Sequence, residues 1–172
     1  MASLPLYAQL INLLAAILLL LSFAMLAQRR VWSLITLFAA QGLALSVSTA
    51  IVAFGTRQPH LYWSAGLTLV LKVMLLPWLL RRLIRQLDVK WDVEGLINIP
   101  TIMLIGIVLV VFSFNLALPI AQLASTVTRA TLGIAMASVM LSCLMMITRL
   151  KAIPQVVGFL AMENGLFFAA TS

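Results

Sequence analysis

Two charged side chains lie near the middle of long apolar runs, where a lipid bilayer tolerates few charges. Lys72 lies within LYWSAGLTLVLKVMLLPWLL and Glu163 within IPQVVGFLAMENGLFFAATS. A charge at the centre of a bilayer costs about 2.5–3.5 kcal/mol on insertion scales, so such residues are usually paired, hydrated or functional. A low-dielectric medium favours the neutral forms of both types of side chain, so each could load and release a proton. We therefore interpret Lys72 and Glu163 as candidates for proton or ion handling.

Each of these residues also has a simpler interpretation. Lys72 could snorkel to the interface, but Arg81 at the helix end is about 13 Å away along the axis, roughly twice the reach of a lysine side chain. Glu163 could make a packing hydrogen bond or be exposed near the end of the chain. If the two charges meet, protonation of the acid decides whether the pair holds, which makes a switch. Gln41, a neutral amide at similar depth, can hydrogen-bond either form and is a candidate polar relay.

Pro77 follows Lys72 in the same apolar run. A proline inside a helix has no N–H to donate and clashes with the carbonyl four residues back, here that of Val73. The resulting kink could open the helix to water or offer an acceptor to an ammonium group, although many kinks in membrane helices are only packing features. The sequence leaves both interpretations open.

The elements that must position these residues are predicted to be membrane-spanning helices. The chain has 172 residues, 64% of them hydrophobic and 9% charged, with a mean hydropathy of +1.17. A helix needs roughly 20 apolar residues to cross ~30 Å of hydrocarbon. The fold class is therefore an all-α integral membrane protein with about six transmembrane helices, expected at 4–27, 31–54, 61–84, 97–118, 125–148 and from 152 onward.

The net charge of +7 does not indicate nucleic-acid binding, because the basic residues cluster at helix ends. The basic loops are 29–30, 81–90 and 149–151, and the positive-inside rule places them on the cytoplasmic side of the membrane, which we expect to be a bacterial inner membrane. The segment 81–95 also holds three of the four acidic residues, and Ile84, Leu87 and Trp91 recur in it at helical spacing. It is predicted to be either an interfacial amphipathic segment that contacts a soluble partner or a solvated connector.

An internal repeat is predicted to organise the helices. Aligning Arg29 with Lys151 sets residues 31–50 against 153–172 and places Gln41 opposite Glu163. Each half then has an apolar helix, a basic turn and a helix with a polar group at mid-depth, as in membrane carriers built from repeated units. We predict a first three-helix repeat over 1–95 and a second over 96–172. The second ends within its expected last helix, so we expect the chain to be a truncated form of a longer polypeptide.

Residues 29–83 resemble the small three-helix K subunit of respiratory complex I, which has a basic turn, a helix with a mid-membrane acid, a short loop and a second such helix. Gln41 and Lys72 occupy the two acid positions here, and Glu163 in LAMENGLFF restores the first acid in the second half. A doubled unit of this type resembles the hydrogenase-4 component E family, which belongs to formate hydrogenlyase-type complexes.

The resemblance implies a non-catalytic subunit in the membrane arm of a membrane-bound nickel–iron hydrogenase complex, beside antiporter-like and soluble subunits. Nickel–iron and iron–sulfur centres would lie in those partners, since this chain lacks the cysteines to hold them and has no metal or catalytic motif. Glu163 would be the protonatable site and Lys72 its electrostatic partner. A structural anchor remains an alternative, as does a free-standing cation antiporter, and the residues do not distinguish protons from sodium ions.

Overall fold

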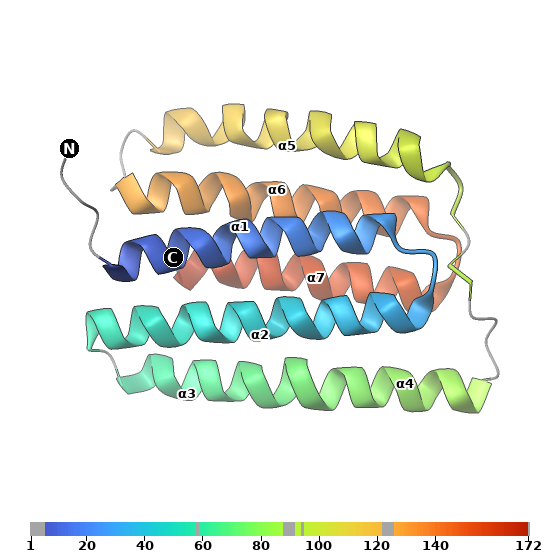
Figure 1. Ribbon diagram of the computed structural model, residues 1–172, viewed down its shortest axis with the longest axis horizontal. Coiled ribbons are helices and arrows are strands. Elements are labelled where there is room, and N and C mark those ends of the chain that lie inside the picture. Colours follow the sequence, from blue (N-terminus) through green and yellow to red (C-terminus); the bar gives the residue numbers. More distant parts are fainter. Residues whose placement is uncertain (1–5, 58, 88–91, 94, 122–125, 172) are drawn as a thin grey trace.

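Six apolar runs form the long helices of the chain, as Figure 1 shows for the computed structural model. The structure describes residues 6–57, 59–87, 92–93, 95–121 and 126–171. All six helices are long and apolar enough to cross a membrane, which confirms an all-α, multi-pass membrane protein. They are α1 (Leu6–Ala27), α2 (Val31–Thr56), a third span made of α3 (Pro59–Thr68), the π-helix η1 (Leu69–Leu75) and α4 (Leu76–Leu87), then α5 (Ile99–Ala121), α6 (Thr126–Thr148) and α7 (Ala152–Thr171).

Two helical hairpins make the centre of the bundle (Figure 1). The hairpin α1–α2 packs against the hairpin α6–α7, with α1 on α6 and α2 on α7. The span α3–η1–α4 flanks α2, and α5 flanks α6 on the opposite side of the bundle. These hairpins are the segments that the predicted repeat sets against each other, and everything else packs around them.

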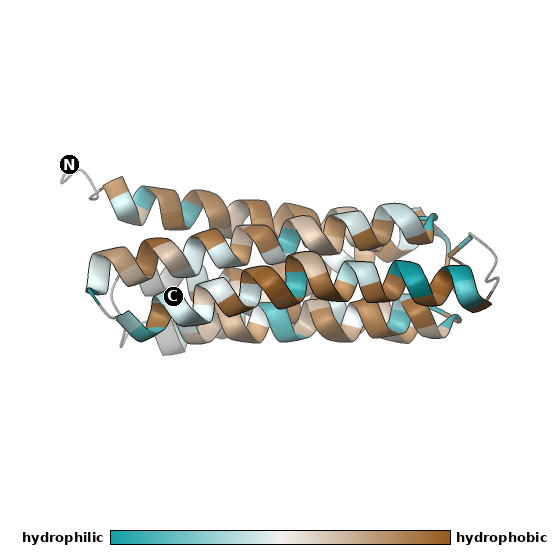
Figure 2. Ribbon diagram, turned by 90° about the horizontal axis from the view of Figure 1, so that it is seen from below, coloured by the Kyte–Doolittle hydropathy of each residue, from teal (hydrophilic) through white to brown (hydrophobic). Residues whose placement is uncertain are grey.

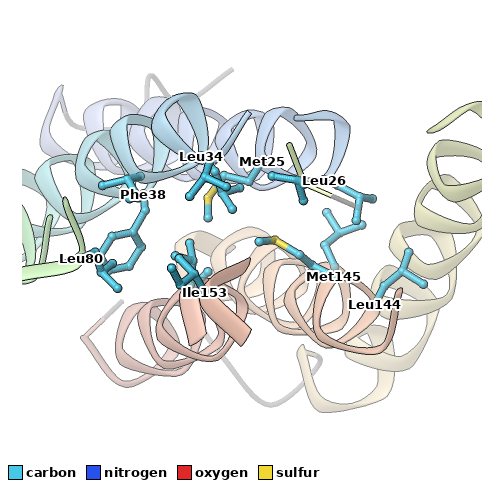
Figure 3. Close-up of a cluster of buried hydrophobic side chains, with 14 of the residues drawn as sticks. Met25, Leu26, Leu34, Phe38, Leu80, Leu144, Met145 and Ile153 are labelled. Carbon is cyan, nitrogen blue, oxygen red and sulfur yellow. The ribbon is translucent and has the colours of Figure 1, made fainter. Parts of the chain in front are cut away.

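The apolar core lies where the two hairpins meet. Side chains from α1, α2, α4, α6 and α7 converge there, among them the labelled residues of Figure 3: Met25, Leu26, Leu34, Phe38, Leu80, Leu144, Met145 and Ile153. In a bilayer, lipid tails are as apolar as the core, so association depends on close packing and polar contacts more than on the hydrophobic effect. The packing of these side chains therefore determines the relative position of the two hairpins.

The hydrophilic residues gather mainly at one end of the bundle (Figure 2). The connector 92–97, of which the structure describes all but residue 94, holds the basic turns together there: the amide of Val93 donates to the carbonyl of Arg29 at 2.6 Å, and that of Leu96 to Thr148 at 2.9 Å. The turns 29–30 and 149–151 thus share the end at which α4 finishes (Figure 1). Of the predicted amphipathic segment 81–95, α4 includes 81–87, whereas 88–91 and 94 lie outside the described residues.

Glycines let α6 and α7 approach closely. A Cβ atom built on Gly165 would lie 3.3 Å from the backbone nitrogen of Val139 and 3.4 Å from the carbonyl oxygen of Ala135. On the same helix, a Cβ on Gly158 would lie 2.9 Å from Met146 Cγ. Small residues at such crossings are a common way for membrane helices to pack. The α6–α7 contact therefore depends on glycine at 165, where the neighbouring atoms are Cγ2 of Val139 at 3.0 Å and the backbone of Val139 and Ala135.

We predict that Gly165→Ala destabilises the protein by about 1–3 kcal/mol, because the added methyl group overpacks against backbone that cannot rotate away. Gly66→Ala is the matched control, since nothing lies within 4 Å of a Cβ there. Alanine favours a helix over glycine by up to about 1 kcal/mol, so the control should be neutral or slightly stabilising. Chemical unfolding of the purified chain in detergent measures both, and equal stabilities would contradict the close α6–α7 contact.

Candidate functional site

Lys72 points into the bundle from the π-helix η1. Its side chain is 10% exposed, and Nζ lies 3.1 Å from Oε1 of Glu163 on α7. Nζ also donates a hydrogen bond to Oδ1 of Asn164 at 2.8 Å. The ammonium group is thus paired inside the protein rather than snorkelling to the membrane surface. The structure brings together the two charges that the sequence singled out.

A chain of hydrogen bonds continues from Lys72 through two amides to α1. Asn164 Nδ2 donates to Gln41 Oε1 at 3.3 Å, and Gln41 Nε2 donates to Ser22 Oγ at 3.1 Å. Ser22 Oγ in turn donates to the carbonyl of Leu18 at 2.9 Å. We call Glu163, Lys72, Asn164, Gln41 and Ser22 the polar chain. It links α1, α2, η1 and α7.

The hydrogen bonds that run from Lys72 to Ser22 all point the same way. From Lys72 to Ser22, each member donates to the next, so every acceptor oxygen faces toward the cation. Hydrogen bonds arranged in sequence polarise one another, which strengthens them in a low-dielectric interior. Gln41 and Asn164 are both almost fully buried. Their aligned dipoles stabilise a positive charge on Lys72.

Glu163 differs from the other members because it faces outward. Its side chain is 51% exposed, whereas that of its neighbour Asn164 is buried. One turn further along α7, the Phe167 ring lies with its centroid 5.5 Å from Lys72 Nζ, in a cation–π arrangement. Glu163 therefore sits at the rim of the site, and its carboxylate reaches the surface of the bundle.

The π-helix η1 changes the interpretation of Pro77. The amide of Leu76 donates to the carbonyl of Leu71, five residues back, which is the register of a π-helix. In a π-helical register the carbonyl of Lys72 would accept a hydrogen bond from the amide of residue 77, and proline has no amide hydrogen to donate. In an α-helical register the carbonyl left without a donor would be that of Val73. Pro77 is buried at the start of α4, directly after the π-turns. The irregular backbone is therefore centred on the lysine.

Two related tripeptides mark the point where the hairpins meet. Gln41 is followed by Gly42 and Leu43, and Asn164 by Gly165 and Leu166. A Cβ on Gly42 would lie only 3.2 Å from Cβ of Lys72, so α2 and η1 approach closely there. The repeat predicted from the sequence sets Gln41 opposite Glu163, one residue before Asn164. These tripeptides are the signal that could have identified Asn164 as the partner of Gln41.

Comparisons with known proteins do not assign a role to the polar chain, so its role is argued from its geometry. No family profile and no solved structure matches the chain. The chain is similar to an uncharacterized protein of Mycobacterium tuberculosis, with 29% identity over 167 residues. That match covers 96% of this chain and 75% of the relative. The similarity thus extends over nearly all of the chain.

We predict that Gln41→Leu destabilises the protein by about 0.5–2 kcal/mol, because Asn164 loses its acceptor and Ser22 its donor. Asn115→Leu is the control: Asn115 is exposed on α5, and its amide donates to Val111 within the same helix. Unfolding in detergent should show a clear loss for the first variant and little change for the second. Equal effects would mean that the buried amide contributes nothing beyond its size.

Proposed function

We propose that this chain is a non-catalytic membrane subunit that handles protons within a membrane-bound nickel–iron hydrogenase complex. The observation that carries the proton role is the polar chain, which holds an ion pair and two buried amides between membrane-spanning helices. Ionisable groups at this depth are costly and are usually retained for function. The hydrogenase setting rests on the resemblance of residues 29–83 and of LAMENGLFF to hydrogenase membrane subunits.

Glu163 is the proposed protonatable group, because its carboxylate reaches the bundle surface while still contacting Lys72. Protonation removes its negative charge and leaves the ammonium group held by Asn164 and the Phe167 ring. Gln41 and Asn164 are not ionisable, so they orient Lys72 rather than release protons themselves. The pair would thus convert a proton at the rim into a change of charge at the centre of the bundle.

The nickel–iron and iron–sulfur centres of such a complex would lie in partner subunits, and antiporter-like membrane subunits would lie beside this chain. The same polar chain also fits a structural anchor, because it ties α7 to η1 and α1 to α2. A stand-alone cation antiporter is a weaker alternative, because the charged groups of the polar chain are a single pair. The two experiments below separate these functions.

Removing the charges singly and together tests the proton role. Glu163→Gln and Lys72→Met should each lower proton uptake coupled to hydrogen evolution in the intact complex by about tenfold or more, since a positioned proton-transfer group contributes roughly 10²–10⁴-fold. The double variant Lys72→Met/Glu163→Gln leaves no unpaired charge, so it should assemble normally yet remain uncoupled. Glu163→Asp, which keeps the carboxylate, should retain partial coupling.

A purely structural role gives a different pattern in the same experiment. The single variants would then reduce the amount of complex on native gels, and the double variant would restore both assembly and coupling. Normal coupling in a fully assembled Glu163→Gln complex would exclude Glu163 as the proton site.

Copurification tests the hydrogenase setting. Extraction of the native membrane in mild detergent through a tag on this chain should recover a nickel–iron hydrogenase large subunit and iron–sulfur proteins, identified by mass spectrometry. A tagged Lys72→Met/Glu163→Gln chain is the control and should recover the same set. Recovery of the chain alone, with cation transport by the purified protein in liposomes, would favour the antiporter instead.

A further inference from the structure

A pocket of about 370 Å³ opens at the basic end of the bundle, away from the polar chain. It lies between the connector 92–97 and the two basic turns, with Arg29 from one turn and Arg149 from the other among its lining residues. The connector contributes Asp92 and Gly95, and Asn98 lies at the start of α5. The pocket is therefore built from segments far apart in the sequence.

Arg149 is buried in the wall of this pocket with only part of its guanidinium group satisfied. The residue is 2% exposed, and Nη2 donates to the carbonyls of Leu26 and Gln28 at 2.6 and 3.1 Å. Nε is buried, and neither Nε nor Nη1 has a hydrogen-bond partner among the described residues. Burial lowers the pKa of Arg149 below its usual value, because desolvation disfavours the charged form. An anion in the pocket would offset that cost.

The rest of the lining also favours an anion. Arg29 is exposed at the rim, and the carbonyl of Asn98 accepts the first hydrogen bond of α5 from Ile102 at 3.0 Å. The pocket therefore also borders the positive end of a long helix dipole. Asp92 is the one acidic residue among the described lining residues, against two arginines. The described lining residues carry a net positive charge and offer guanidinium donors.

We propose that this pocket binds a phosphate group, presented by the headgroup of an anionic phospholipid or by free phosphate. A guanidinium group matches phosphate oxygens in a planar, two-pronged arrangement, which is why arginine is common at such sites. The pocket lies beside the ends of membrane-spanning helices, and basic pockets between such helices bind lipid headgroups in other membrane proteins. This site is independent of the proton role of Lys72 and Glu163.

The test uses the full chain purified in detergent and in nanodiscs. Inorganic phosphate is titrated by calorimetry in the first, and retained phosphatidylglycerol is counted by native mass spectrometry in the second, against nanodiscs of phosphatidylcholine alone. Arg29→Gln should weaken binding about tenfold, as expected for the loss of one charge-assisted contact. Asp92→Asn should tighten binding severalfold because it removes the opposing charge. Arg30→Gln, a neighbouring arginine that does not line the pocket, is the matched control and should bind as the unaltered protein does.

The two measurements also identify the source of the phosphate group. Retention of phosphatidylglycerol without binding of inorganic phosphate assigns the pocket to lipid, and the reverse assigns it to a soluble anion. The proposal is overturned if neither probe binds, or if Arg29→Gln and Asp92→Asn change binding no more than Arg30→Gln does. Arg29 and Asp92 are exposed, so these variants probe the pocket without removing the buried Arg149.

Discussion

An ammonium group buried between membrane helices must find its partners inside the bundle, and the position of η1 follows from that need. Lys72 is buried, and both of its polar partners, Asn164 and Glu163, lie on α7. Leaving one member of a buried ion pair alone is strongly destabilising, by about 3–5 kcal/mol in known cases. The flanking span α3–η1–α4 packs chiefly on α2, and Lys72 gives this span a polar contact with α7 in the hairpin α6–α7. The close approach of η1 to α2 at Gly42 allows this contact to form.

Adjacent residues on α7 give Lys72 two partners of different character. Asn164 is neutral and buried, whereas Glu163 is titratable and half-exposed, and successive residues on a helix point about 100° apart. The asparagine can hold the ammonium group whether or not the glutamate is charged. A change of charge at Glu163 therefore alters the strength of the pairing without leaving the cation wholly unpaired. Two acids at these positions could not divide the two roles in this way, because both the residue that holds the ammonium group and the residue that changes charge would be titratable.

The sequence predicted those features that depend on local pattern. Apolar length located the six helices to within a few residues. Lys72 and Glu163 do meet, and Gln41 is joined to Lys72 through Asn164, because charged and amide groups in an apolar medium pair with one another. The π-helix η1 was not predicted, since its register depends on how Pro77 and Lys72 pack rather than on composition. The role of Ser22 was not predicted either, because the hydrogen bond from its hydroxyl to the carbonyl of Leu18 could have satisfied that hydroxyl within α1 alone. The sequence also does not show whether Glu163 or its neighbour Asn164 faces Gln41, because the packing of the hairpins determines this.

The two central hairpins are joined by polar contacts at two levels, which limits where the proposed protonation of Glu163 could move the structure. At the basic end, Arg149 donates to the carbonyl of Leu26 at the end of α1 and to that of Gln28, and the connector joins the turns 29–30 and 149–151. At mid-depth, Gln41 and Asn164 join α2 to α7 through buried amides. The π-helix η1 has weaker backbone geometry and lies on the flank, so it is the element with freedom to respond. A shift of η1 by one residue would turn Lys72 by about 100°. We therefore expect a change of charge at Glu163 to act on η1 rather than on the hairpins.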